Sequence, residues 1–372
     1  MKAWIATILG AVRGAGAVCA LLGVTTHGAM ADATMPVLDH VFLIVMENHS
    51  YGDILDNGNA PFIRKFAHEG NLATHYFAVG HPSLPNYLEI VGGSNFGIQS
   101  DDAPDWHGAH PGPGVIEPFA GTGTDAPVIA MFAPSGVALP ASRYQADNLG
   151  DQLARAGKTW KTYQEALPVT GEVDGVNYSD GMFTDSQEGM YPVSGMIEHL
   201  YAVKHNPFAY FASIQSGRNP ASSLANVRGF DGLNGLYADL ADGHVPSLSF
   251  IVPNQCHDMH GMSNAGELCA NDDARVRMGD IEVQNLVGAI HASPVWKQGH
   301  NAIVLVWDEN SYGNQPNRVV MVVDTSDGSH GRQSQRAYSH FALLKSLEAG
   351  FGLGCINHAC DSNVSLMTDL FR

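Results

Sequence analysis

Basic residues are scarce in this chain, which has 19 Lys and Arg against 37 Asp and Glu in 372 residues. The formal net charge at pH 7 is −18. Binding to nucleic acid relies on Lys and Arg side chains that neutralise backbone phosphates, so this excess of acidic residues disfavours such a partner. We therefore expect no nucleic acid among the partners of this protein.

Apolar runs of membrane-spanning length are absent beyond the N-terminus. Residues 1–31 begin with a basic residue, continue with an apolar stretch and end in a small-residue cleavage pattern, which is typical of a secretory signal peptide. We predict that residues 32–372 form a single exported domain, periplasmic or extracellular, with no stable membrane anchor. The alternatives are lipidation at Cys19 or an N-terminal anchor, and Arg13 inside the apolar stretch disfavours the anchor.

Cysteine is also sparse, with five residues in the chain and four beyond the predicted signal. An even number of cysteines in an exported protein favours disulfides. Of the three possible pairings we favour the local one, Cys256 with Cys269 and Cys355 with Cys360, because it closes two short loops. The alternative is a zinc site, which the lack of any CxxC pair disfavours.

Hydrophobic residues make up 45% of the chain, enough for a large core. Two continuous apolar runs, at 41–46 and 302–307, have the character of buried parallel strands and end in Glu47-Asn48 and Asp308-Glu309. The carboxyl ends of parallel strands open into the crevice where such sheets bind ligands, so we expect both polar pairs at one sheet edge. Further strands are predicted at 208–213, 248–252 and 319–323.

Helical patterns alternate with these strands, which predicts an α/β fold with a mainly parallel sheet covered on both faces. The predicted helical segments are 53–68 (loop and helix), 147–165 with Asp147 as its cap, 280–291 and a last helix from His340. Residues 92–142 are rich in Gly, Pro, Asp and His, and we interpret them as a long loop or cap over the strand ends.

Ser83 has a distinctive position relative to a predicted helix. Pro85 suits the first turn of a helix, where its missing N–H group costs nothing. Ser83 then lies just ahead of the helix N-terminus, where free amide groups and the positive end of the helix dipole favour an anion.

Carboxylates, an amide and imidazoles that converge on one sheet edge can hold one or two divalent cations. A bound cation lowers the pKa of a serine hydroxyl and neutralises phosphate oxygens, and a histidine can protonate a leaving alkoxide. The residue types together therefore indicate phosphoryl transfer. The four groups involved are Glu47-Asn48, His81-Pro82-Ser83, the segment 253–260 with His257, Asp258 and His260, and Asp308-Glu309 together with His340.

Five motifs in order resemble the bacterial phosphoesterase family of secreted acid phosphatases and phospholipases C, a branch of the alkaline phosphatase superfamily. They span residues 40–353, and together they are far more specific than any one alone. The matching segments are 44–50 (IVMENHS), 81–87 (HPSLPNY), 258–260 (DMH), 305–309 (LVWDE), and 338–344 (YSHFALL) with 350–353 (GFGL).

This resemblance implies an alkaline phosphatase-like α/β/α sandwich that hydrolyses small phosphate esters. It casts Ser83 as the nucleophile and assigns the remaining roles by position. In that assignment Glu47, Asn48, Asp308 and Glu309 bind a cation beside Ser83. Asp258, His260 and His340 lie across the phosphate as second-metal ligands or, in members with a single metal, as phosphate-binding and acid groups, with His260 as the catalytic one. His81, His257 and Asn86 lie near the substrate. The metal, Zn or Ca or a similar ion, and the number of ions stay open.

Alternatives remain for both residues and function. Ser50 is the rival nucleophile, and Glu47-Asn48 alone is also typical of a turn after a strand. We interpret His205 and the other remaining histidines as surface or loop residues. The chain is short for the phospholipase C branch, which favours an acid phosphatase-like monoesterase. A phosphodiesterase or phospholipase C using the same site, or a non-catalytic exported protein that binds metal or phosphate, is the alternative.

Overall fold

The computed structural model describes residues 34–96, 98, 101, 118–119, 124–125, 147–167, 200–262, 265–311 and 316–372. The predicted signal at 1–31 lies outside the described residues, as does most of the predicted cap at 92–142. Residues from Thr34 onward form one unit. Among the described helices, none combines the length and the apolar character that a membrane crossing requires.

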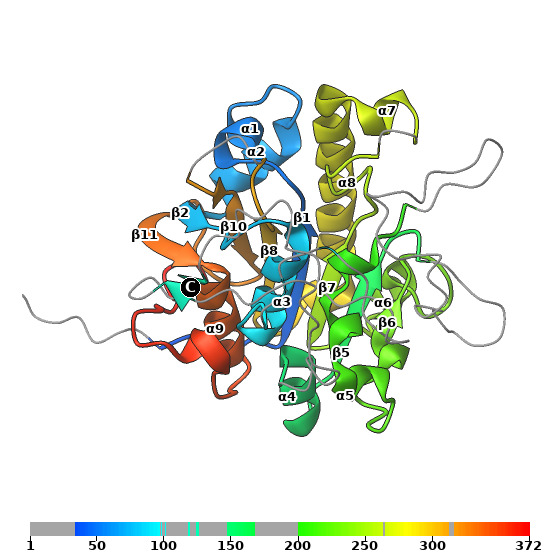
Figure 1. The fold of residues 1–372 in the computed structure, drawn as a ribbon, viewed down its shortest axis with the longest axis vertical. Helices are drawn as coiled ribbons and strands as arrows, with labels where there is room; N and C mark the ends of the chain where they lie inside the picture. Colours follow the sequence, from blue (N-terminus) through cyan, green and yellow to red (C-terminus); the bar gives the residue numbers. More distant parts are fainter. Residues whose placement is uncertain are drawn as a thin grey trace, which may run out of the picture. The chain divides into compact units, whose positions relative to one another are not determined.

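A nine-stranded sheet forms the centre of this unit, in the order β11-β2-β10-β8-β1-β7-β5-β6, with β9 beside β2 (Figure 1). Neighbours are parallel except β10, which runs antiparallel to β8 and β2, and β9, which runs antiparallel to β2. The mainly parallel α/β class is therefore confirmed. The strands are β1 (His40–Met46), β2 (Asn71–Phe77), β5 (Trp160–Gln164), β6 (Val227–Arg228), β7 (Leu248–Val252), β8 (Asn301–Trp307), β9 (Arg318–Val319), β10 (Met321–Thr325) and β11 (Gln333–Ser339), with β3 (Pro118–Phe119) and β4 (Thr124–Asp125) in a separate pair.

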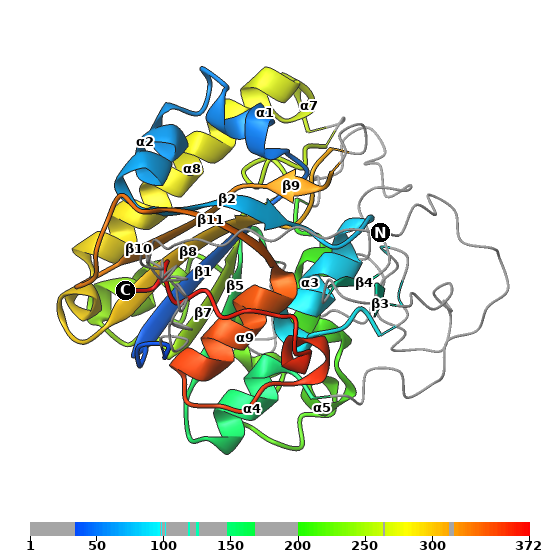
Figure 2. The ribbon, with the colours of Figure 1, turned by 90° about the vertical axis from the view of Figure 1, so that its left-hand side faces the viewer.

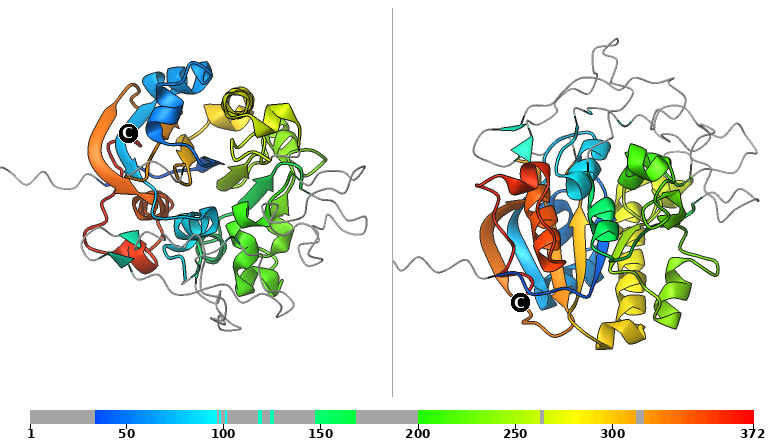
Figure 3. Two further views of the ribbon diagram at one scale, coloured as in Figure 1. Left: turned by 45° about the horizontal axis from the view of Figure 1, so that its top comes forward. Right: turned by 90° about the horizontal axis from the view of Figure 1, so that it is seen from below.

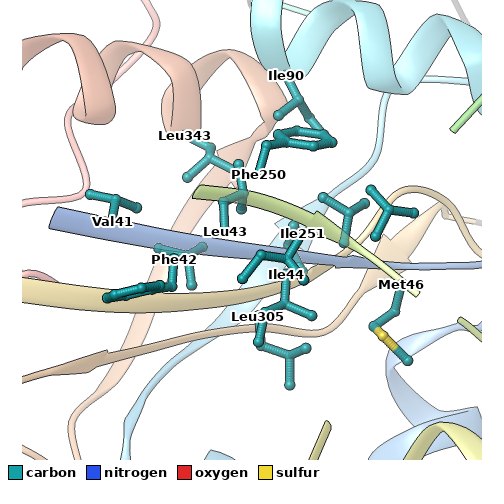
Figure 4. Close-up of a cluster of buried hydrophobic side chains, with 14 of the residues drawn as sticks. Val41, Phe42, Leu43, Ile44, Met46, Ile90, Phe250, Ile251, Leu305 and Leu343 are labelled. Carbon is teal, nitrogen blue, oxygen red and sulfur yellow. The ribbon is translucent and has the colours of Figure 1, made fainter. Parts of the chain in front are cut away.

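The central strands β1 and β8 are buried on both faces, which explains their unbroken apolar sequences. Their parallel register pairs His40 with Asn301 and Met46 with Trp307, so both strands end at the same level. Side chains from β1, β7 and β8 pack together with residues of the helices in this core (Figure 4). The register brings the polar residues that follow each strand side by side.

Helices cover both faces of the sheet, as an α/β/α arrangement requires (Figure 2). Helices α2 and α8 pack together on one face, and α9, α3 and α4 lie side by side on the other (Figure 3). The helices are α1 (Tyr51–Leu55), α2 (Pro61–Glu69), α3 (Ser83–Gly92), α4 (Leu149–Arg155), α5 (Ala212–Gln215), α6 (Leu236–Asp242), α7 (Glu267–Ala270), α8 (Asp272–Ala292) and α9 (His340–Gly350), with 3₁₀ turns η1 (Val203–His205), η2 (Pro207–Tyr210), η3 (Leu224–Asn226), η4 (Pro294–Lys297) and η5 (Asn357–Cys360).

Two predicted elements are wrong. The apolar run at 208–213 is not a strand but the turn η2 followed by α5, since Pro207 begins a helical turn and apolar runs alone do not distinguish the two structures. The predicted helix at 147–165 ends at Arg155, Gly157 adopts φ +71, and the second half is strand β5. Its N-cap is Asn148 and not the predicted Asp147. The Asn148 side chain accepts a hydrogen bond from the main-chain N–H of Asp151.

The predicted disulfides are present, Cys256–Cys269 and Cys355–Cys360. The first of these links the segment after β7 to helix α7. This segment holds three of the predicted site residues, so the disulfide restrains one wall of the candidate site.

Candidate active site

The ends of β1 and β8 deliver three carboxylates to one buried place. Glu47, Asp308 and Glu309 are each at most 1% exposed. The two strand ends are joined by hydrogen bonds, because Asp308 N donates to Met46 O at 2.9 Å and Asn48 N donates to Asp308 Oδ1 at 3.2 Å. Asn48 has φ +55, a left-handed conformation that asparagine tolerates better than most residues. The predicted convergence of the two polar pairs is therefore what the structure shows.

Ser83 lies at the same place, as the first residue of α3. Its hydroxyl donates to Glu47 Oε2 at 2.9 Å, with a longer contact of 3.4 Å to Glu309 Oε1. Every residue of α3 is buried, and the helix is capped at its C-terminus by Gly93, whose φ of +66 suits glycine. Ser83 is thus held rigidly against the carboxylates, while the rival Ser50 caps α1 by accepting from Asp53 N.

Asn86 supports the loop before α3. Its Oδ1 accepts from the main-chain N–H groups of Val79 and Gly80, and its Nδ2 donates to Gly80 O, Pro82 O and Glu309 Oε2. The predicted role in substrate binding does not fit these contacts, because both polar atoms of the side chain hold the protein itself. Asn86 positions the Ser83 loop and Glu309.

His81, by contrast, lies within the site. Its Nδ1 is 2.8 Å from Glu309 Oε2. Burial lowers the pKa of His81 to about 4, against the smaller opposing effects of Asn310 and Asp101. His81 is therefore neutral at neutral pH, and its ring orients the Glu309 carboxylate.

His205 is the main residue that the sequence interpretation missed. We predicted a surface or loop histidine, but His205 is 1% exposed. Its Nε2 is 2.9 Å from Glu47 Oε1, its Nδ1 is 3.1 Å from Asp258 Oδ2, and its ring stacks on Tyr87 with centroids 5.3 Å apart. It lies in the short turn η1, so no strand end or motif pointed to it.

His205 and Glu47 stabilise each other's charges. Burial alone would lower the pKa of His205, but Glu47 and Asp258 outweigh it and raise the pKa to about 10. Burial alone would raise the pKa of Glu47, but His205 outweighs it and lowers the pKa to about 2. His205 thus keeps the carboxylate that accepts the Ser83 hydroxyl in its ionised form.

His260 differs from its predicted role as an acid. Burial, and next the Lys204 ammonium, lower its pKa to about 3. Its Nδ1 is 2.8 Å from Gly261 O and its Nε2 is 3.2 Å from Lys204 Nζ, which fits a neutral ring with a lone pair at Nε2. Met259 before it has φ +81, a conformation that methionine rarely adopts and that is typical of functional loops.

His340 and His257 also differ from their predictions. The Nε2 of His340 lies 2.7 Å from the main-chain O of Asp308 and its Nδ1 lies 2.9 Å from the Tyr76 hydroxyl, so both ring nitrogens serve as supports and neither is offered to a cation. His257 pairs with Glu165 at 2.8 Å, an arrangement in which its ring supports the loop after β7. Asp258 points into the site, where it meets His205 as described.

The carboxylates fit a bound cation. Burial first, and then Glu47 and Glu309, raise the pKa of Asp308 well above its ordinary range. Burial and Glu47 do the same to Glu309. Among the described residues, neither Asp308 Oδ2 nor Asn48 Oδ1 has a hydrogen-bond partner, although both atoms are buried. A divalent cation would satisfy these oxygens and offset the repulsion between the carboxylates.

A second set of ligand atoms adjoins the first. Among the described residues, Glu47, His205 and His260 offer one atom each within 4.8 Å of one another. Glu47 belongs to both sets. His205, however, faces carboxylates with both ring nitrogens and its pKa is raised to about 10, so a cation could bind at this second position only after His205 loses a proton.

Comparison with known proteins gives a consistent result. A family model described as the Phosphoesterase family matches residues 53–354. A phosphatidylinositol-3-phosphatase from Mycobacterium tuberculosis (strain ATCC 25618 / H37Rv) is 26% identical over 354 residues, which cover 94% of this chain and 88% of that protein. A phosphate-repressible acid phosphatase from Penicillium chrysogenum is 25% identical over 309 residues, 82% of this chain and 58% of that protein.

Solved structures show the same fold. A protein of the alkaline phosphatase superfamily from Vibrio parahaemolyticus matches with a TM-score of 0.50 at 11% sequence identity, over 87% of this chain and 69% of that chain. At this identity the likeness concerns the fold alone.

Proposed function

This chain belongs to the Phosphoesterase family and hydrolyses phosphoric esters, and we propose that it acts on phosphate monoesters through a phosphoserine at Ser83. One observation carries the proposal. The Ser83 hydroxyl donates to Glu47 Oε2 at 2.9 Å in the first turn of a buried helix, among three buried carboxylates. A serine with only a structural role would not require a position among three buried carboxylates.

The proposal includes a divalent cation, which when bound neutralises phosphate oxygens and makes the serine oxygen a better nucleophile. Glu47, Asn48, Asp308 and Glu309 would hold it, because their oxygens are buried together and two of them lack partners among the described residues. His81 and Asn86 orient Glu309, and His340 holds the main chain of Asp308.

The reaction then has two steps. The Ser83 hydroxyl loses its proton to solvent as its oxygen forms a bond to phosphorus; the bond to the ester oxygen breaks, and the departing alkoxide takes up a proton from water. Water attacks the phosphoserine next, which releases inorganic phosphate and returns the hydroxyl to Ser83. Glu47 aligns the Ser83 hydroxyl before the first step, and His205 keeps Glu47 ionised.

The names of the relatives support a monoester substrate, since acid phosphatase and phosphatidylinositol-3-phosphatase both denote removal of a phosphate group. Two disulfides support the proposal that the protein works outside the reducing cytosol.

The test compares hydrolysis of p-nitrophenyl phosphate with that of bis-p-nitrophenyl phosphate. We expect wild type to favour the monoester, and Ser83→Ala to lose at least about a thousandfold in kcat. The matched control is Ser50→Ala, which removes a helix cap outside the site and should keep most of the activity. A Ser83→Ala variant with full turnover would refute the nucleophile, and preference for the diester would refute the substrate class.

A further inference from the structure

Lys204 is a buried cation that Asp101 links to Leu84, the residue after the proposed nucleophile. Its side chain is 0% exposed, and its ammonium lies 2.8 Å from Asp101 Oδ2 and 3.2 Å from His260 Nε2. A buried lysine is costly unless its charge is compensated, so its place in this site calls for an explanation. The contacts of Asp101 explain how this charge is compensated.

Asp101 uses its two carboxylate oxygens on two different donors. Oδ2 faces the Lys204 ammonium, and Oδ1 accepts the main-chain N–H of Leu84 at 3.1 Å. Leu84 follows Ser83 directly and lies in the first turn of the ten-residue helix α3. The Asp101 carboxylate therefore joins a buried ammonium to a main-chain amide beside the nucleophile. The Asp101 side chain is itself only 9% exposed.

Asp101 lies close to other carboxylates of the site. Asp101 accepts from the main chain of Leu84, and the preceding residue Ser83 contacts the carboxylates of Glu47 and Glu309. An ammonium and a helix N-terminal amide, however, are donors that suit two oxygens of a phosphoryl group. The carboxylate likewise presents two negatively charged oxygens at a similar spacing.

We propose that Asp101 is an internal stand-in for the phosphoryl group, and that Lys204 and the Leu84 N–H bind a phosphate oxygen pair when the substrate displaces it. The inference rests on the proposed function and names the residues that recognise the phosphate besides the cation ligands. Asp101 then competes with phosphate, and its release is part of substrate binding.

Competition of this kind has a measurable size. If the open form of the anion site is one tenth of the population, the apparent Kd for phosphate is about tenfold weaker than the intrinsic one. Removal of the Asp101 charge should therefore tighten binding. A purely structural Asp101, which only neutralises Lys204, predicts the opposite, because its loss leaves a buried charge unpaired and the pocket disordered.

The experiment measures binding of inorganic phosphate by titration calorimetry, with the protein as purified, in wild type, Asp101→Asn and Lys204→Met. We expect Asp101→Asn to lower the Kd and the KM for p-nitrophenyl phosphate by about tenfold. Lys204→Met should raise both by tenfold or more, because the ammonium is lost. The control is Asp147→Asn, which removes an exposed carboxylate paired with Arg155 and should change neither.

A double variant separates the loss of the binding site from misfolding caused by an unpaired buried charge. The double variant Asp101→Asn/Lys204→Met removes both charges and should fold, with phosphate affinity as weak as that of Lys204→Met alone. A Kd that stays within twofold of wild type in both single variants overturns the inference, as does weaker binding in Asp101→Asn. Absence of ester hydrolysis by wild type would instead overturn the proposed function, while the calorimetric comparison would still decide the anion site.

Discussion

The hydroxyl of Ser83 lies 2.9 Å from Oε2 of Glu47, although the two residues are 36 positions apart in the chain. One begins a helix and the other follows a central strand, so their contact depends on the packing of α3 against the sheet. The contact also depends on His205, which pairs with the other oxygen of Glu47 at 2.9 Å. Loss of either support should therefore affect both the fold and the chemistry.

Replacement of His205 by Asn should destabilise the protein strongly. Glu47 and Asp258 are fully buried, and without His205 two carboxylates lose their counter-charge. We expect the free energy of unfolding in urea to fall by about 3 kcal/mol in chelator-treated protein. The exposed His68→Asn is the control and should shift it by less than about 0.5 kcal/mol. Equal stability of the two variants would show that the bridge contributes nothing.

Replacement of Asp308 by Asn should have opposite effects on stability and on activity. Burial and the neighbouring carboxylates raise the pKa of Asp308, so without a cation its charge is unfavourable. We expect the variant to melt at a higher temperature than wild type when both are chelated, and to be nearly inactive when metal is supplied. Elemental analysis of the two proteins should show less bound metal in the variant. Unchanged metal content would count against Asp308 as a ligand.

Glu348 gives a prediction about pH away from the site. Burial raises the pKa of Glu348 from 4.5 to about 8, against the smaller effect of Gln152. The folded state therefore holds a proton that the unfolded state releases, and the contribution of Glu348 to stability is fully present below pH 4.5 and is lost as pH rises to about 8. Glu348→Gln, which keeps the neutral form, should match wild type near pH 4 and exceed it in urea denaturation at pH 8. Parallel stability curves over this range would contradict the assignment.

The sequence was most informative where residues carried a regular pattern. The apolar runs of β1, β7 and β8 predicted buried strands, and their last residues predicted where Glu47 and Asp308 meet. Strands β2 and β11 escaped prediction, because NLATHYF and QSQRAYS contain few apolar residues and gain their stability from pairing with each other. Tertiary context, not local pattern, decides such strands.

The site was predicted in outline but not in its electrostatics. Motif order placed Ser83 among the carboxylates, and that placement needed no knowledge of side-chain contacts. His205 and Lys204 lie in a short 3₁₀ turn whose sequence carries no periodic signal, so only the folded chain shows that they face Glu47 and His260. Likewise, the supporting role of His340 depends on the Tyr76 hydroxyl from a strand that the pattern did not reveal.

The most direct test of the central claim is to find the phosphate on the protein. Wild-type protein is mixed with p-nitrophenyl phosphate, quenched in acid within the first turnover, digested and analysed by mass spectrometry. We predict a phosphorylated peptide with the modification on Ser83, and none in Ser83→Ala. A phosphate on another side chain such as Ser50, or a Ser83→Ala protein that turns over at the wild-type rate, would contradict the account.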